Sequence, residues 1–238
     1  MNKGLTADWR RKLQELARGN EEYAKFHKRI VNTKKMVLGV RVPDLRKTAK
    51  SLAGEMKTAA DVQEFLTDIN DQILEEVLSA GFVINYAKLN ADDKIKLTRN
   101  YLTKVDSWAE VDLFSEHHKK ADLDKYWDCA MASLQDKNEF VVRFGIMVCL
   151  ANFLTAEKLA SVFAALRQLK SDKYYVKMAM AWLYAEAAVK FYEVTMAEIK
   201  RAEIDEWTRR KAWQKMLESR RISDSHKAEI RAARKRND

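Results

Sequence analysis

The chain has few of the residues that interrupt helices, with one proline and six glycines among 238 residues. Proline and glycine are the residues that most disfavour helix interiors, so their scarcity predicts an all-helical protein. Cysteine is also scarce. Cys129 and Cys149 are the only two, without CxxC spacing, which argues against a disulfide framework or a zinc ribbon. No apolar run approaches the roughly 18 residues that a membrane-spanning helix needs, so we expect a soluble, cytoplasmic protein.

Positive charge is abundant. The chain has 44 lysines and arginines against 35 aspartates and glutamates, a formal net charge of +9. A charge of this size favours a polyanionic partner, either nucleic acid or an anionic membrane surface. The basic C-terminal segment lacks the broad apolar face of a membrane-binding helix. We therefore expect nucleic acid as the partner and no membrane.

Helix-start residues recur at a regular interval in the middle of the chain. They stand at Thr58, Asn90, Asp122 and Thr155, which are 32, 32 and 33 residues apart. A second helix follows in each interval, with predicted starts near Asn70, Ser107, Asn138 and Asp172. Helix pairs at such a spacing are typical of α-solenoids, although these residue types are common enough for coincidence to remain an alternative. The pattern predicts an all-α, right-handed superhelix of HEAT-like helix pairs.

The predicted array forms one domain over residues 1–238, with helices in 1–57 and basic helices in 195–238 as its caps. Thr195 and Glu198 have the spacing of a capping box, which predicts that a helix of the basic end begins there. Near the other end, Pro43 follows a glycine turn and predicts a helix start. Around it lies a basic patch, which consists of Lys34, Lys35, Arg41, Arg46 and Lys47.

The stretch Ser107-Trp108-Ala109-Glu110-Val111-Asp112 places an aromatic residue close to a carboxylate. Ser107 and Glu110 have capping-box spacing, so a helix is predicted to start here. Trp108 and Asp112 then lie one turn apart on the same face. Plain packing explains such a pair, and so does a site for a flat, cationic ligand.

Later inner helices contribute further unusual residues. Arg143 lies in the apolar segment 139–154, and Lys177 and Trp182 lie in the apolar segment 173–191. Equivalent positions of successive solenoid helices line one concave surface, so these three are predicted to converge with Trp108 and Asp112 on a groove. The alternative is a buried Asp112–Arg143 ion pair beside two core tryptophans.

At these segments the chain resembles the AlkD-like DNA alkylation repair enzymes, which are DNA glycosylases built of HEAT-like repeats. The matching segments are 39–46, 108–112, the surroundings of Arg143 and 174–182, and the resemblance extends over about residues 20–230. It implies base excision repair, namely hydrolytic removal of cationic alkylpurines such as 3-methyladenine and 7-methylguanine from duplex DNA without base flipping. By the same resemblance, Asp112 is the catalytic carboxylate, Trp108 and Trp182 pack against the damaged nucleotide, and Arg143 holds a phosphate.

The implied chemistry suits these residue types. An N-alkylated purine is already a cationic leaving group, so no strong general acid is needed. A carboxylate stabilises the positive charge that develops on the sugar, and indole faces favour the same charge. The predicted DNA contacts are Arg143, Lys177, Arg41, Arg46, Lys47, Lys34 and Lys35.

The sequence departs from the family pattern at four positions, which are Ile30, Ser107, Val142 and Ala185. These departures keep two other hypotheses open: an inert protein that binds DNA structures, and a solenoid adaptor for an acidic protein. No cofactor is indicated. Metal binding by Glu116-His117-His118 is not expected, because adjacent histidines point to different faces of a helix. A monomer is the default expectation.

Overall fold

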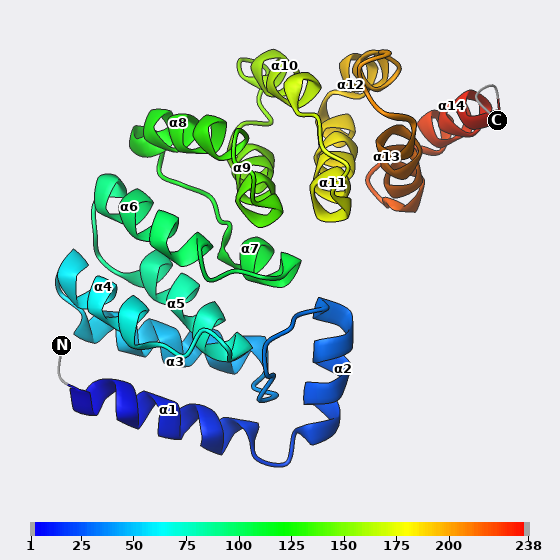
Figure 1. The fold of residues 1–238 in the computed structure, drawn as a ribbon. Coiled ribbons are helices and arrows are strands. Elements are labelled where there is room, and N and C mark those ends of the chain that lie inside the picture. The colour runs from blue at the N-terminus through cyan, green and yellow to red at the C-terminus, as the bar shows by residue number, and fades with distance from the viewer. Residues whose placement is uncertain (1–2, 236–238) are drawn as a thin grey trace. The chain divides into compact units, whose positions relative to one another are not determined.

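The protein is all-helical, as seen in a computed structural model that describes residues 3–235 (Figure 1). The described chain contains fourteen α-helices, one short 3-10 helix and no strand beyond an isolated bridge between Met36 and Ile73. The all-α prediction is therefore confirmed. Residues 1, 2 and 236–238 of the predicted caps lie outside the described part.

The chain divides into two compact units, Met1–Phe114 and Ser115–Asp238. Unit 1 contains α1 (Lys3–Ala17), α2 (Glu21–Val31), α3 (Val42–Glu55), α4 (Ala59–Asp68), α5 (Leu74–Tyr86), α6 (Ala91–Leu102) and α7 (Trp108–Phe114). Unit 2 contains η1 (Lys120–Asp122), α8 (Leu123–Ser133), α9 (Glu139–Asn152), α10 (Leu159–Gln168), α11 (Tyr174–Lys190), α12 (Tyr192–Ile199), α13 (Glu206–Glu218) and α14 (Asp224–Lys235).

Within each unit, alternate helices pack on one another as in an α-solenoid. In unit 1, α3 packs against α5, α5 against α7, and α4 against α6. In unit 2, α9, α11 and α13 form one row and α8, α10 and α12 a second row above it (Figure 1). The solenoid packing is thus seen inside each unit, while the single domain and the hand of a superhelix stay predictions.

The inner helices are buried on nearly all sides, as their apolar sequences predict. Every residue of α5 from Leu74 to Ile84 is buried, and so is α9 from Val142 to Cys149. Gly145 lets α8 approach α9 closely, because a Cβ atom there would lie 2.8 Å from the backbone oxygen of Ala130. The two cysteines are buried and form no disulfide, and burial raises the pKa of Cys149 to about 12.

Most predicted helix starts are confirmed. Thr58 forms a complete capping box with Asp61, and the side chains of Asn90 and Asn138 cap α6 and α9. Pro43 lies in the first turn of α3. The starts predicted at Asp122 and near Asp172 are also found. Helix α8 begins one residue after Asp122, and α11 begins two residues after Asp172.

Three predicted starts differ from the helix bounds. Thr155 caps the turn that leads into α10, because its hydroxyl accepts from the Lys158 N–H at 3.3 Å and its carbonyl accepts from the Leu159 N–H at 2.9 Å, although α10 itself begins four residues later. Likewise, α5 begins four residues after Asn70. Thr195 lies inside α12, where its hydroxyl donates to the carbonyl of Phe191 at 2.7 Å instead of capping a helix. Its supposed partner Glu198 faces Arg167, with 2.6 Å between their charged atoms. A threonine bonded back to the preceding turn is the alternative that cap spacing does not distinguish.

Candidate active-site residues

The helix that contains Trp108 and Asp112 is α7, which has only seven residues. An isolated helix of that length is not stable in water, so contacts with the rest of unit 1 must hold it in place. These contacts lie at both of its ends and along one side.

An ion-pair network fixes the start of α7. The ammonium of Lys35 lies 2.9 Å from a carboxylate oxygen of Asp106 and 3.1 Å from one of Glu110. The side chains of Lys35 and Glu110 are only 5% and 0% exposed. The other Glu110 oxygen accepts hydrogen bonds from the Ser107 hydroxyl at 2.8 Å and the Asp106 N–H at 3.0 Å. Asp106 also accepts from the Thr33 hydroxyl at 2.6 Å, so the network ties α7 to the segment after α2.

Lys35 is the counter-charge that both carboxylates share. Burial raises the pKa of Glu110, against the opposing effects of the Lys35 charge and the hydrogen bonds from Ser107 and Asp106. Burial by itself would raise the pKa of Asp106. Hydrogen bonds from Thr33 and Lys35 outweigh this effect, so the pKa of Asp106 lies below its ordinary value. The predicted helix start at Ser107 is confirmed, since α7 begins at Trp108. The Glu110 carboxylate accepts hydrogen bonds from the Ser107 hydroxyl and from the Asp106 N–H, one residue before the predicted cap.

Side chains from two other helices hold the end of α7. The last carbonyls of any helix need partners from outside that helix. The Arg46 guanidinium donates to the Leu113 carbonyl at 2.9 Å, and the Asn85 amide donates to the Phe114 carbonyl at 2.7 Å. The same guanidinium lies 4.2 Å from the centre of the Phe82 ring. Arg46 is thus engaged inside unit 1.

Trp108 is fixed along the side of α7. Its indole N–H donates to the backbone carbonyl of Ile30 at 3.3 Å, and its side chain is half-buried. Asp112, one turn further on, is also half-buried and lies on the same face of the helix. The short helix therefore presents an indole and a carboxylate from a position held by the surrounding contacts.

The basic patch of unit 1 divides into internal and exposed residues. Lys35 and Arg46 are held by α7 and its surroundings, and their assignment as DNA contacts stays a prediction. Lys34, Arg41 and Lys47 are exposed and stay candidates. A basic sequence patch does not distinguish a solvated lysine from one that neutralises buried carboxylates.

In unit 2, Arg143 connects two inner helices. Its side chain is only 5% exposed, and its guanidinium donates to the Tyr175 carbonyl at 2.8 Å. The rings of Phe140 and Tyr175 lie 5.5 Å apart beside this bond. Arg143 thus links α9 to the first turn of α11, and its contact with a phosphate stays a prediction.

Lys177 faces the start of α13. Its ammonium lies 2.8 Å from an Asp205 carboxylate oxygen and 5.1 Å from the centre of the Trp207 ring. Burial raises the pKa of Asp205, but hydrogen bonds from Lys177 and Thr208 outweigh it and lower that pKa overall. Lys177 therefore helps to hold α13 against α11.

Trp182 borders a shallow hollow of about 230 Å³ between α11 and α13. The other residues that line this hollow are Ala185, Glu186, Lys215, Glu218 and Ser219. The Trp182 side chain is half-buried, whereas Ala185 is buried. Trp108 and Asp112 belong to unit 1, and Arg143, Lys177 and Trp182 belong to unit 2. Their predicted convergence on one groove therefore stays a prediction.

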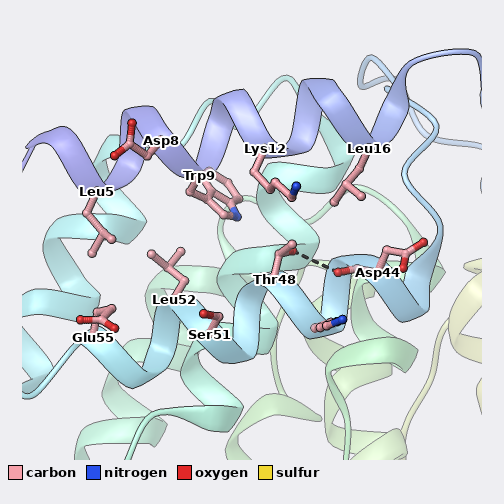
Figure 2. Close-up of a pocket in the computed structure, with 11 residues that line it drawn as sticks. Leu5, Asp8, Trp9, Lys12, Leu16, Asp44, Thr48, Ser51, Leu52 and Glu55 are labelled. Atoms are coloured by element: carbon pink, nitrogen blue, oxygen red, sulfur yellow. Dashed lines mark hydrogen bonds between the residues drawn. The ribbon is translucent and has the colours of Figure 1, made fainter.

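A larger pocket of about 620 Å³ lies between α1 and α3 of unit 1 (Figure 2). Leu5, Trp9, Leu16 and Leu52 supply its apolar walls, as Figure 2 shows. Of the site residues that the sequence predicts, only Lys47 lines this pocket. The pocket is therefore separate from the candidate catalytic residues on α7.

Sequence analysis missed the buried acids that organise unit 1. The sequence indicates Glu110 only as part of a helix cap, and no motif singles out Glu75. Glu75 is fully buried, and its carboxylate accepts backbone hydrogen bonds from Leu38, Gly39 and Val40 at 2.9, 2.8 and 3.3 Å. The available signal was a glutamate within an otherwise apolar helix, since such a residue needs a partner.

Across residues 3–235, no three His, Cys, Asp or Glu side chains are grouped so that they could hold a metal ion. Within the same residues, no helix combines the length and the apolar character needed to cross a membrane.

These features define a helical-repeat protein of the all-α class, with an indole and a carboxylate on a pinned short helix and exposed basic residues in the same unit. A comparison with curated proteins finds no relative that matches the chain. The model of a family described as DNA alkylation repair enzyme matches residues 10–216, and the chain belongs to that family. Its role accordingly lies in the repair of alkylated DNA, which implies interaction with DNA.

Proposed function

We propose that the protein is a DNA glycosylase that excises cationic alkylpurines, such as 3-methyladenine and 7-methylguanine, from duplex DNA. The observation that carries the proposal is the fixed position of α7, which presents Trp108 and Asp112 from one face. Membership in the DNA alkylation repair family supports the same reading. A seven-residue helix held at both ends suits a site that must be organised before its ligand arrives.

The proposed reaction needs little from the protein beyond electrostatics. The bond between C1′ of the sugar and the purine nitrogen breaks, and its electron pair leaves with the base, which neutralises the base's positive charge. Positive charge then develops on the sugar, and water adds to C1′ with release of a proton. The Asp112 carboxylate stabilises the developing charge and orients this water. The base stays stacked in the duplex, as the family resemblance implies.

The tryptophans support the same charge. An indole face attracts a cation and excludes water, which strengthens the carboxylate's effect. Trp108 is suited to this because its N–H is held by the Ile30 carbonyl. Trp182 is proposed as a second aromatic contact from the family resemblance.

DNA contacts are proposed for the exposed basic residues. In unit 1 these are Lys34, Arg41 and Lys47. In unit 2, Arg143 is proposed through the family resemblance and Lys177 through its predicted place on the groove, although each also has a partner within the unit. Replacing one exposed lysine that touches a phosphate should reduce the slope of log affinity against log salt by about 0.9.

The decisive experiment measures release of 7-methylguanine from alkylated duplex DNA against spontaneous loss. Asp112→Asn keeps the side-chain shape and should lower the rate by about 10²- to 10³-fold, the effect of removing one electrostatic stabiliser. Trp108→Ala should cost less, because it removes packing and cation–π support and leaves the carboxylate. Asp124→Asn, an exposed change on α8, is the matched control and should leave the rate unchanged.

Three outcomes would redirect the proposal. A wild-type protein that binds duplex DNA but releases base no faster than spontaneous loss is the inert DNA-binding relative. A protein whose affinity for duplex DNA is weak at low salt and flat across salt is the adaptor for an acidic protein. An Asp112→Asn variant as fast as the wild type would show that the carboxylate is structural.

A further inference from the structure

Two rows of side chains lie beside each other along α11 and α13 in unit 2. Residues spaced by four lie on the same face of a helix. On α11 this row is Tyr174, Met178, Trp182 and Glu186, and on α13 it is Trp207, Lys211 and Lys215. The two rows meet at one end, where the rings of Tyr174 and Trp207 lie 5.7 Å apart, and near the other end, where Trp182 and Lys215 border the same hollow. We call this surface the aromatic–lysine strip.

Tyr174 is the most open ring of the strip. More than half of it, 56%, is exposed. Its ring meets Tyr175 edge-on at 5.2 Å and Trp207 edge-on at 5.7 Å, so two neighbours set its orientation. The ring is both accessible and fixed, and it therefore loses little entropy when a flat ligand stacks on it.

Lysines flank the ring that supports Tyr174. The ammonium groups of Lys177 and Lys211 lie 5.1 and 5.8 Å from the centre of the Trp207 ring. Lys215 continues the positive charge one turn beyond Lys211, toward Trp182. From Tyr174 to Trp182 the strip is about 12 Å long, because eight residues of helix rise by about 1.5 Å each. That length matches a short run of nucleotides.

We propose that the aromatic–lysine strip binds an unpaired stretch of DNA, with a base stacked on Tyr174 and the strand's phosphates beside Lys211 and Lys215. An open aromatic ring next to positive charge is the combination that binds single-stranded nucleic acid, because every base has a face that stacks. In an intact duplex the base faces are already stacked on one another, so Tyr174 gains no such contact there. This binding activity goes beyond the proposed glycosylase and requires no catalysis.

The chemistry of the strip favours nucleic acid over a protein partner. An acidic peptide would use the lysines, but it would leave the exposed Tyr174 ring without a flat partner. A hydrophobic protein surface would use the ring, but it would desolvate Lys211 and Lys215 at a cost. A nucleotide satisfies the ring and the two lysines together.

The test compares the affinities of the full-length protein for a labelled oligothymidine and for a labelled, fully paired duplex, measured by fluorescence anisotropy. Tyr174→Ala should weaken oligothymidine binding by about 5- to 100-fold, the range for loss of one base–aromatic stack. Tyr174→Phe, which keeps the ring, should bind like the wild type. Val194→Ala on α12 is the matched control, because Val194 is also 56% exposed and lies outside the strip.

Several results would overturn the proposal. Equal losses for Tyr174→Ala and Tyr174→Phe would show that the hydroxyl matters and stacking does not. Equal losses on oligothymidine and duplex would indicate a backbone contact, and competition by polyglutamate as effective as that by unlabelled oligothymidine would indicate charge alone. Absence of oligothymidine binding by the wild type would remove the strip's function, whereas the duplex arm and the base-release assay report separately on the proposed glycosylase.

Discussion

Replacing Lys35 by methionine should destabilise unit 1 by about 3–5 kcal/mol, the cost of removing one partner of a buried ion pair. Methionine keeps most of the aliphatic stem, so the change removes the charge while limiting lost packing. Glu110 carries most of the cost, because its side chain is fully buried and would keep its charge without a counter-ion. Asp106 contributes less, since it is 28% exposed and retains its bonds to Thr33 and to the Lys34 N–H.

The pH dependence of this variant has a definite sign. Burial already raises the pKa of Glu110, and loss of the Lys35 charge, which opposes that rise, should raise it further. A carboxyl whose pKa is higher in the folded than in the unfolded protein costs stability at high pH, and this cost fades as the pH falls through the folded pKa. The difference in stability between Lys35→Met and the wild type should therefore shrink on mild acidification.

The assay is urea unfolding at two pH values, combined with hydrogen exchange of residues 101–114 to follow α7 itself. Adding Glu110→Gln to Lys35→Met should recover much of the lost stability, because no buried charge is then left unpaired. A loss below about 1 kcal/mol for Lys35→Met, or no recovery in the double variant, would refute the reasoning. The single variant should also slow base release if the position of α7 matters to the proposed reaction.

Three further outcomes follow from buried contacts. Glu75→Gln should cost about 1–3 kcal/mol, because an amide offers one acceptor oxygen where the loop's three N–H groups need more, and urea unfolding measures this cost. Gly145→Ala should cost about 1–3 kcal/mol and be visible in the same assay, because the added Cβ meets the Ala130 carbonyl at 2.8 Å. The lowered pKa of Asp205 means that its stabilisation is present above its unfolded pKa and is lost as the pH falls through its folded pKa; Asp205→Asn should flatten the acid dependence of thermal unfolding, and a variant with an unchanged acid limb would contradict this.

The sequence predicted helix content and most helix starts, because these depend on local chemistry. The caps at Thr58, Asn90 and Asn138 are local hydrogen bonds, and all three are present. The helix start predicted at Thr195 is wrong because its hydroxyl bonds back to the turn before it. Only the surrounding packing decides between this bond and a cap. Local signals therefore gave the elements more reliably than their ends.

The candidate site was less accessible to sequence reasoning. Trp108 and Asp112 could be placed on one helix face from their spacing, but the contacts that fix α7 join residues far apart in the chain. Lys35 and Arg46 looked like surface charges because nothing nearby in sequence reveals Glu110 or the Leu113 carbonyl. An ion pair between distant segments leaves no periodic pattern, so the sequence does not reveal that these two cations also have partners inside unit 1.

The carboxylate of Glu75 also constrains how the chain can vary in length. Three consecutive N–H groups, from Leu38 to Val40, converge on one buried acid, and Gly39 sits there at a φ of +97° with no room for a side chain. An inserted or deleted residue in this connection would shift at least one N–H away from the acid, and a proline would remove one altogether. The link between α2 and α3 should therefore tolerate neither insertions nor circular permutation, unlike an ordinary surface loop. It acts as a fixed-length spacer rather than a hinge.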